Sequence, residues 1–256
     1  MLAVERRKNI MAMLQENHVV VVPELSKLLN VTEETIRRDL EKLEKEGFLK
    51  RTHGGAVLNE SSGIDLPFSL REITNVEGKE AIGNKVAEFI HDGDTIMLDS
   101  SSTALQIAKY IKQKKNITVI TNSVNILLEL TNVKECKVIS TGGILRPHSL
   151  SFVGHLTESA LGKYHVDKAF ISCKGIDMKK GISESNEMES EVKKKMVQNA
   201  EKVFLVVDST KFDKTSFVKL LQLSEIDAIV TDESPSDPWE KYLQNAGIEV
   251  IYSKCL

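Results

Sequence analysis

The stretch NVTEETIRRDLEKLEKEG, residues 30–47, constrains the fold more than any other part of the chain. Thr32 is a good N-cap, and the helix that follows it is expected to run to about Glu46. Gly47 stands where the residue after a helix C-cap usually adopts a left-handed conformation. An apolar stripe at helical spacing is formed by Ile36, Leu40 and Leu43.

The other faces of this helix carry threonine, arginine and further charged side chains: Thr35, Arg37, Arg38, Glu41 and Lys42. A helix that shows threonine and arginine to solvent suits the major groove of DNA, because arginine can bind the O6 and N7 edge of guanine. Arginine can equally bind a phosphate. An ordinary surface helix with charged pairs is the alternative that this helix alone leaves open.

The segments on either side favour DNA binding. Upstream, residues 23–29 predict a short helix, and Asn30-Val31 a tight turn, which together give helix-turn-helix spacing. Downstream, two short extended runs surround a basic loop and the pair Gly54-Gly55, as in a β-wing. The wing residues that can reach phosphates or a minor groove are Lys50, Arg51 and His53.

Residues 3–16 are expected to form the first helix of this head. Arg6, Arg7 and Lys8 on that helix either touch phosphate or belong to a solvated face. Residues 19–22 form a short strand paired with the wing or an extended lead into the next helix.

The run TIRRDLEKLEKEGFLKRTHGGAV, with the words TIRRDL and HGGA, resembles the N-terminal domain of DeoR-type bacterial transcriptional regulators across about residues 1–58. The resemblance implies a winged helix-turn-helix that binds a double-stranded DNA operator. One departure is Val21-Val22-Pro23, where the family often has serine or threonine. Proline pre-sets the first helical turn, so a weaker cap and a retained helix are expected. The predicted DNA-binding residues are Thr32, Thr35, Arg37, Arg38, Lys42, Lys50, Arg51 and His53.

The charge distribution fits a DNA contact confined to one end of the chain. The net charge of the 256 residues is −3, whereas residues 1–58 hold ten Lys or Arg against nine Asp or Glu. A locally basic head on an acidic body permits DNA binding without demanding it.

Several classes of protein are excluded by composition. There is no run of 18 apolar residues, so no membrane span or membrane partner is expected, and the N-terminus is too polar for a secretory signal. Cys136, Cys173 and Cys255 are odd in number and widely spaced, which favours a reducing cytoplasm over a disulfide framework. The histidines and cysteines show no ligand spacing, so we expect neither a metal nor another cofactor.

Residues 59–77 lack a clear period and hold Ser, Gly and Pro, so they are interpreted as an inter-domain linker. From residue 78 to 256 helical and strand patterns alternate, which predicts an α/β domain with a mostly parallel sheet. Ligands of such sheets bind at the carboxyl ends of the strands. Strands are expected at 95–99, 117–121, 137–141, 168–173, 203–207, 228–231 and 248–252.

Three polar loops follow predicted strands and therefore converge at one edge of the sheet: residues 99–103, 121–123 and 142–146. Hydroxyls and backbone N–H groups at a helix N-terminus can hold a phosphate, although elaborate N-caps explain the same residues. Two lysines end later strands at the same edge. The candidate effector-binding residues are Asp99, Ser100, Ser101, Ser102, Thr103, Thr121, Asn122, Gly143, Arg146, Lys174 and Lys211. Residues 181–186 predict a hairpin arm, and Lys193-Lys194-Lys195 a solvated helix face.

The words GGILRPHSLSFVG, DKAFISCKGID and VDSTKF resemble the effector-sensing domain of DeoR-type regulators, which is similar in fold to ribose-phosphate isomerases and CoA transferases. The resemblance implies a phosphorylated sugar or related metabolite as effector. It also implies a homo-oligomer, dimer or tetramer, that acts mostly as a repressor of carbohydrate genes. Ser101 replaces the glycine of the usual Asp-x-Gly-[Ser/Thr]-Thr loop, and its Cβ is expected to restrict the approach of phosphate.

The alternative function is a sugar-phosphate isomerase-like enzyme with an accessory DNA-binding head. Those isomerases carry an Asp-Gly-Ala-Asp word after the strand that corresponds to residues 169–171, and here the loop reads Ser-Cys-Lys-Gly. Both carboxylates are missing on that alignment. A phosphate site without its general base binds ligand without turnover, so a sensor is favoured over an enzyme.

Overall fold

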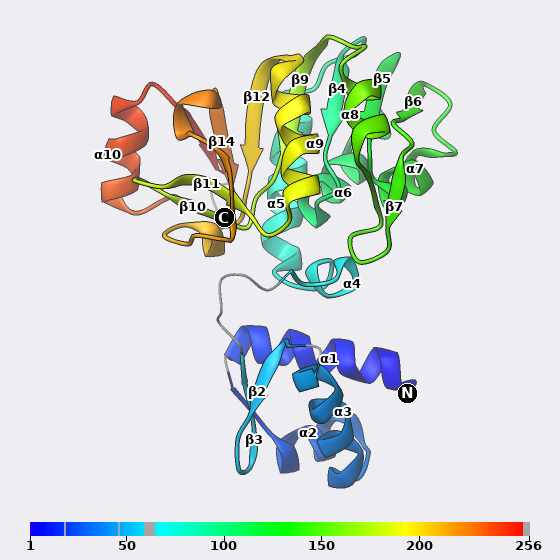
Figure 1. Ribbon diagram of the computed structural model, residues 1–256, viewed down its shortest axis with the longest axis vertical. Coiled ribbons are helices and arrows are strands. Elements are labelled where there is room, and N and C mark those ends of the chain that lie inside the picture. Colours follow the sequence, from blue (N-terminus) through cyan, green and yellow to red (C-terminus); the bar gives the residue numbers. More distant parts are fainter. Residues whose placement is uncertain (18, 46, 59–64, 253–256) are drawn as a thin grey trace. The chain divides into compact units, whose positions relative to one another are not determined.

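The computed structural model describes residues 1–17, 19–45, 47–58 and 65–252. The chain divides into two compact units, Met1–Thr74 and Asn75–Leu256 (Figure 1). Glu46, Cys255 and the first part of the predicted linker lie outside the described residues. Within the described ranges no helix is long and apolar enough to cross a membrane.

The first unit has the predicted winged helix-turn-helix arrangement. Its three strands form an antiparallel sheet in the order β1-β3-β2, and its helices surround one apolar core. The elements are α1 (Ala3–Asn17), β1 (Val19–Val21), α2 (Val22–Leu29), α3 (Glu33–Lys45), β2 (Leu49–Arg51), β3 (Gly55–Leu58) and α4 (Phe68–Arg71).

Helix α3 begins and ends as its sequence predicts. The Thr35 amide donates to the Thr32 hydroxyl at 3.3 Å, which is the N-cap bond. Gly47 has φ +83°, and the Phe48 amide donates to the Leu43 carbonyl at 3.0 Å. These are the features of a C-terminal glycine motif.

Strand β1 pairs with β3 of the wing, which decides between the two alternatives for residues 19–22. The pairing is close at Gly55, where a Cβ would overlap the carbonyl oxygen of Val20. The following helix, α2, has Val21 as its N-cap with no side-chain hydrogen bond, and Pro23 lies in its first turn. The weaker cap and the retained helix are therefore both confirmed.

The second part of the predicted linker, residues 59–77, contains helical structure that the sequence interpretation did not expect. The helix α4 lies within it, and α5 already begins at Val76. Leu70 is buried in the core of the first unit, with Leu66 and Ile73 packed against that core. A helix of four residues is too short to show a period in the sequence, so its only signal was the apolar spacing of these side chains.

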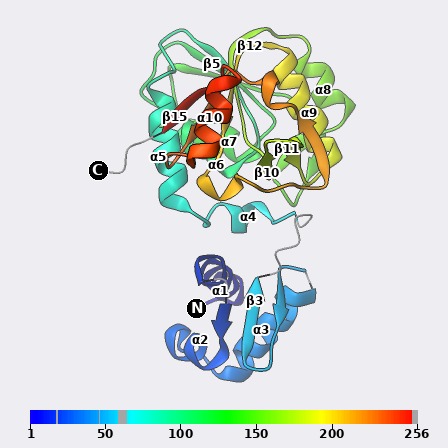
Figure 2. The same ribbon diagram turned by 90° about the vertical axis from the view of Figure 1, so that its left-hand side faces the viewer.

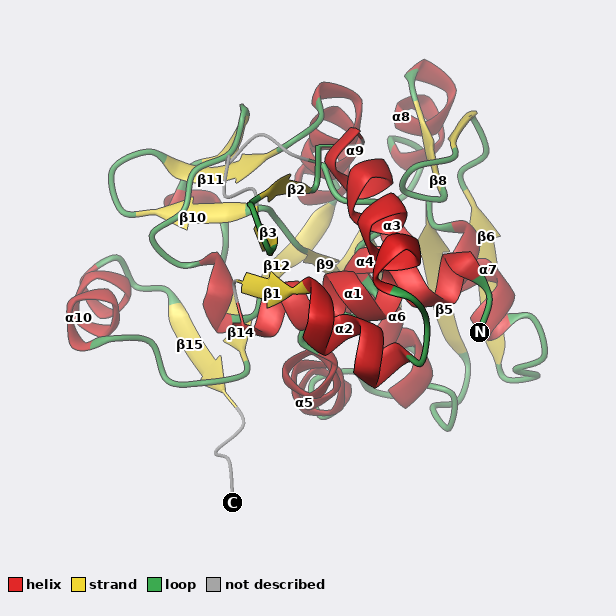
Figure 3. Ribbon diagram, turned by 90° about the horizontal axis from the view of Figure 1, so that it is seen from below, coloured by secondary structure: helices red, strands yellow, loops and turns green. Residues whose placement is uncertain are grey.

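The second unit is built on a seven-stranded sheet in the order β15-β14-β12-β9-β4-β5-β6, as Figure 3 shows from below, and all its strand pairs are parallel. Helix α5 lies on one side of the sheet and helices α8 and α9 on the other (Figure 2). The sheet strands and main helices are β4 (Thr95–Leu98), β5 (Ile117–Thr121), β6 (Cys136–Ser140), β9 (Val166–Ile171), β12 (Ala200–Val206), β14 (Ala228–Thr231), β15 (Glu249–Tyr252), α5 (Val76–Ala87), α6 (Ser102–Tyr110), α7 (Val124–Leu130), α8 (His155–Leu161), α9 (Glu187–Gln198) and α10 (Asp237–Asn245).

The direction of strand addition reverses between β4 and β9. Strands β5 and β6 extend the sheet from β4 one way, and β12, β14 and β15 extend it from β9 the other way. Asp99 follows β4 and Ser172 follows β9. In open α/β sheets the ligand crevice lies at this switch point, outside the carboxyl ends of the strands.

The remaining short elements were not predicted individually. A hairpin joins β7 (Ile144–Arg146) to β8 (Ser151–Val153). A second small sheet has the order β10-β11-β13, so the predicted arm at 181–186 contains its central strand. Its strands are β10 (Gly175–Asp177), β11 (Gly181–Glu184) and β13 (Val218–Leu221), and single 3₁₀ turns are η1 (Ser209–Lys211) and η2 (Leu223–Glu225).

Candidate functional site

All the predicted DNA-binding residues are exposed except Thr35, which is half-buried. Arg37 contacts Glu33 at 2.6 Å, and Arg38 contacts Glu34 at 3.2 Å, each one turn back along α3. Exposed pairs of this kind contribute roughly 0–1 kcal/mol, so the two arginines can exchange glutamate for phosphate or base at little cost.

Helix α3 and the wing share a small pocket. It is lined by Arg37 of α3 and by Arg51, Thr52 and His53 of the wing, among other residues. The structure therefore brings together predicted contacts that are separated by a turn and a strand in the sequence.

Arg6 and Arg7 do not form the phosphate contact or solvated face expected for the first helix. Arg6 Nε lies 2.5 Å from Asp39 Oδ2, and Arg7 Nη1 lies 3.4 Å from Asp39 Oδ1. Asp39 belongs to α3 and is only 4% exposed. This buried pair joins α1 to the recognition helix.

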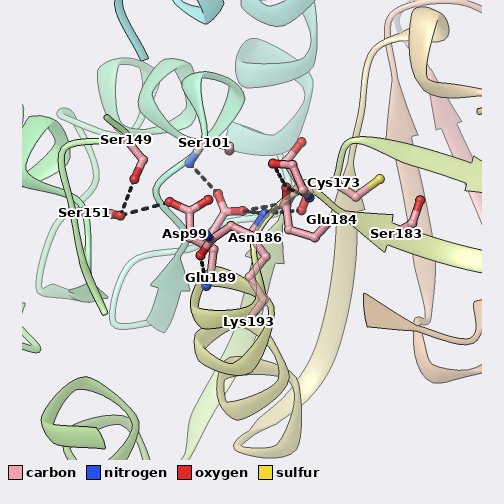
Figure 4. A network of polar contacts seen from close by, with 12 residues as sticks. Asp99, Ser101, Ser149, Ser151, Cys173, Ser183, Glu184, Asn186, Glu189 and Lys193 are labelled. Carbon is pink, nitrogen blue, oxygen red and sulfur yellow. Dashed lines mark hydrogen bonds and ion pairs between the residues drawn. The ribbon is translucent and has the colours of Figure 1, made fainter. Parts of the chain in front are cut away.

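In the second unit, Asp99 joins the two strands of the switch point (Figure 4). Its Oδ1 accepts a hydrogen bond from the Ser101 amide at 3.0 Å, and its Oδ2 accepts one from the Ser172 amide at 2.8 Å. Lys193 Nζ lies 3.4 Å from the same Oδ2. Asp99 thus fixes the loop geometry.

Lys193 belongs to this polar network, and the sequence interpretation did not include it among the candidate site residues. It is 5% exposed, donates to the Ser172 carbonyl at 2.8 Å and forms a short ion pair with Glu184. The prediction of a solvated face is wrong for this lysine, whereas Lys194 and Lys195 are half-buried. The available signal was its spacing: Lys193 lies one residue after Val192 and three before Met196, at the margin of the buried face.

The charges of this cluster stabilise one another. Burial alone would raise the pKa of Glu184, but the ammonium groups of Lys193 and Lys174 lower that pKa to about 2. Burial would lower the pKa of Lys193, and the carboxylates of Glu184, Asp99 and Glu189 outweigh it and raise that pKa. Both partners of the Glu184–Lys193 pair are therefore charged at neutral pH.

The loop between β4 and α6 is lined by buried hydroxyls. Ser101 caps α6, because its hydroxyl accepts a hydrogen bond from the Ala104 amide at 3.0 Å. Its φ is −78°, an ordinary extended conformation. Serine in place of glycine therefore imposes no backbone strain here. The predicted residues of this loop are all at most 6% exposed: Asp99, Ser100, Ser101, Ser102 and Thr103.

In the loop after β5, the Thr121 hydroxyl makes two hydrogen bonds, whereas one atom of Asn122 makes none. Thr121 is fully buried, and its hydroxyl donates to the Leu98 carbonyl at 2.7 Å and accepts from the Ser123 amide at 3.1 Å. Asn122 donates through Nδ2 to the Phe152 carbonyl at 2.9 Å, while its buried Oδ1 has no partner. Thr121 thus supports the loop, whereas the buried Oδ1 of Asn122 is an acceptor without a donor.

Arg146 stands at the end of β7 in the hairpin that follows Gly143. Its Nη1 donates to the Ser149 hydroxyl at 2.9 Å and to Glu189 Oε1 at 3.3 Å. The Ser151 hydroxyl donates to the same Glu189 oxygen at 3.1 Å (Figure 4). The hairpin is therefore connected to α9.

Lys211 lies in η1, after β12, with its Nζ 3.9 Å from Asp208 Oδ2. Burial would raise the pKa of Asp208, and the charge of Lys211 and the hydrogen bonds from Thr210 lower it. Lys174 follows β9, and its charge acts on Glu184. Among the described residues, no cluster of three or more His, Cys, Asp or Glu side chains is suited to a metal ion.

An exposed helix with a wing, joined in one chain to a doubly wound α/β unit whose polar loops follow the sheet strands, is the arrangement of an effector-sensing transcriptional regulator. Residues 6–62 match the DeoR-like helix-turn-helix domain, and residues 74–233 match the DeoR C terminal sensor domain. The chain belongs to the DeoR family, and it is a DNA-binding transcriptional regulator rather than an enzyme.

Two curated relatives illustrate the similarity. The chain is 43% identical over 250 residues to the uncharacterized HTH-type transcriptional regulator YulB of Bacillus subtilis, covering 98% of this chain and 96% of that protein. It is 38% identical over 230 residues to the L-fucose operon activator of Haemophilus influenzae, covering 90% and 92%. Among solved structures, ribose 5-phosphate isomerase a of Methanocaldococcus jannaschii matches at 16% identity and a TM-score of 0.40, covering 54% of this chain and 55% of that one.

Proposed function

We propose that this protein represses carbohydrate genes and that a phosphorylated sugar, bound in the second unit, changes its affinity for an operator. The observation that carries the proposal is the convergence of hydroxyl-rich and cation-bearing loops at the switch point between β4 and β9. The names of relatives support the carbohydrate class, since they include an L-fucose operon activator and a putative aga operon transcriptional repressor.

The head is proposed to read DNA with two surfaces. Helix α3 enters the major groove, with Thr32, Thr35, Arg37, Arg38 and Lys42 toward the bases and flanking phosphates. Lys50, Arg51 and His53 of the wing hold the backbone. Two or more chains associate as a dimer or tetramer and present their heads to repeated half-sites.

The effector is proposed to lie across the carboxyl ends of the strands. Its phosphate takes the N-terminus of α6, where Ser100, Ser102 and Thr103 supply hydroxyls, because helix N-termini favour anions. The unpartnered Asn122 Oδ1 accepts a sugar hydroxyl. Positive charge comes from Arg146, Lys174 and Lys211, while Asp99, Ser101, Thr121 and Gly143 hold the loops in place.

The effector can change DNA affinity only by binding two conformations of the protein unequally. We expect the effector to relieve repression, which requires tighter binding to the conformation that has the lower affinity for DNA. The coupling is reciprocal, so operator DNA should weaken effector binding by the same factor.

Fluorescence anisotropy of the full-length protein on DNA from its own upstream region tests this function, with unrelated DNA as the control and a panel of sugar phosphates as ligands. We expect preferential binding to the upstream DNA and a change with at least one sugar phosphate. Equal affinity for both DNAs, or no response to any sugar phosphate, would contradict the proposal.

Two variants separate the head from the effector site. Arg38→Ala should weaken DNA binding by about 1–3 kcal/mol without changing effector affinity, because a base or phosphate contact is lost. Lys211→Ala should abolish the effector response and leave DNA affinity intact. An unchanged response in the second variant would remove Lys211 from the site.

A further inference from the structure

Arg146, which the proposed function assigns to effector binding, already forms an ion pair with Glu189. The two side chains come from the β7–β8 hairpin and from the first turn of α9, 43 residues apart. Both are largely withdrawn from solvent, with side chains 16% and 4% exposed. An anionic ligand that approaches Arg146 therefore meets a guanidinium that is already bound to a carboxylate.

The geometry of this pair is that of a contact that can be exchanged. Nη1 and Oε1 are 3.3 Å apart, longer than the roughly 2.7–2.9 Å of a strong charge-assisted hydrogen bond. The Glu189 oxygen in this contact, Oε1, also accepts a hydrogen bond from the Ser151 hydroxyl, so Arg146 shares that oxygen with a second donor. A phosphate can offer Arg146 two parallel charge-assisted bonds, which are stronger than this long contact with Glu189.

Glu189 keeps compensating charge if it loses Arg146. Lys193 follows one turn later on α9, and the charges of these two groups already act on each other. The Ser151 hydroxyl also continues to donate to the carboxylate. Release of Arg146 therefore does not strand a buried charge, which would otherwise make the exchange prohibitively costly.

We propose that Glu189 is an internal competitor for Arg146, displaced by the phosphate group of the effector, and that it makes the site selective for phosphorylated over neutral ligands. A neutral sugar cannot replace the carboxylate, because it brings no charge to the guanidinium. The inference rests on the proposed function and adds to it a residue that opposes binding of every weak anion.

Glu189→Gln in the full-length protein tests the competition, with inorganic phosphate as the probe in isothermal titration calorimetry. Glutamine keeps the shape and an acceptor for Ser151 but removes the charge that holds Arg146. We expect phosphate to bind about 3- to 10-fold more tightly to the variant, because a competing charge is removed. The matched control is Glu191→Gln, on the same helix, where an exposed pair with Lys194 is lost and phosphate affinity should not change.

A double-mutant cycle makes the test specific to Arg146. In the Arg146→Gln background phosphate binding should be weaker, and Glu189→Gln should no longer improve it. The same improvement with and without Arg146 would show a general charge effect and would overturn the proposal. Weaker or unchanged phosphate binding in Glu189→Gln would also overturn it, since a carboxylate that contacts the ligand, or lies outside the site, gives those results.

The two proposals fail in different ways. If the wild-type protein binds a sugar phosphate but Glu189→Gln is not tighter, only the competition is wrong. If neither the wild type nor any variant binds inorganic phosphate or a sugar phosphate, the proposed effector site itself is wrong, and the competition falls with it. Should Glu189→Gln fail to fold, Glu189→Asp withdraws the carboxylate from Arg146 and should tighten phosphate binding in the same direction.

Discussion

Helix α3 of the first unit and the Lys193 cluster of the second unit use charge in opposite ways. On α3 the cations are exposed and pair with glutamates four residues earlier in the same helix. In the second unit Lys193 is buried and pairs with Asp99, 94 positions earlier in the chain, and with Glu184. The first arrangement leaves cations ready to exchange partners with DNA, whereas the second holds loops from distant strands in one geometry.

This contrast predicts where substitutions are costly. Exposed pairs contribute roughly 0–1 kcal/mol, whereas removal of one partner of a buried pair costs about 3–5 kcal/mol because a charge remains without compensation. The following expectations test that difference from the largest effect to the smallest.

Lys193→Met should reduce the free energy of unfolding of the second unit by about 3–5 kcal/mol, because Asp99 and Glu184 lose the buried cation that they share. Urea unfolding of the full-length protein measures the change. Lys194→Met is the control one position along, where loss of an exposed pair should cost less than about 1 kcal/mol. Equal costs for the two lysines would remove the contrast between buried and exposed pairs.

Glu184 should make the second unit sensitive to acid. Its folded pKa of about 2 lies below the ordinary 4.5, so its stabilisation is complete above pH 4.5 and is lost as pH falls toward 2. The loss should be on the order of 3 kcal/mol. Thermal unfolding of the wild type and of Glu184→Gln across this range should converge at low pH, and parallel pH profiles would show that another group is responsible.

Asp39→Asn tests the buried pair that Arg6 and Asp39 form in the head. Asparagine keeps a hydrogen-bond acceptor for Arg6 but removes the charge, so we expect a loss of about 2 kcal/mol. Hydrogen exchange at the Leu40 and Leu43 amides reports opening of α3. Glu41→Gln removes an exposed pair with Lys45 and should cost less than about 0.5 kcal/mol. Similar exchange in both variants would contradict the assigned role of Asp39.

Ser101→Gly restores the residue usual in the family and should have the smallest effect. Because Ser101 caps α6 with an ordinary φ, glycine should cost only a few tenths of a kcal/mol. Sugar-phosphate affinity should be nearly unchanged, as measured by calorimetry. A large gain in affinity would show that the Cβ of Ser101 does restrict the approach of phosphate.

Most of the structure of the head could be predicted from local sequence patterns. The cap, apolar stripe and glycine of α3 are all contained within residues 30–47, so the recognition helix and its wing could be predicted. The helix α4 could not, because four residues hold no complete period. In the second unit the sheet strands were predictable from buried runs, while their order was not.

The polar network of the second unit depends on contacts that spacing cannot show. Lys193 was grouped with its two lysine neighbours, and Glu189 had no partner in sequence at all. Their roles become visible only when β4, β9 and the β7–β8 hairpin meet α9. The position of each polar loop directly after a strand predicted which loops converge. Which side chains in those loops support the site depends on contacts that form only in the folded chain.

The close contact of Gly55 with Val20 has a consequence for regulation. Strand β3 pairs with both β1 and β2, and β1 leaves no room for a side chain at position 55, so the wing and β1 form one closely paired sheet. We therefore expect each head to move as one unit with a single DNA-contacting surface. If chains associate as proposed, the effector then changes the distance between the heads and not the shape of each head. The length of DNA between half-sites would then determine how strongly an operator responds.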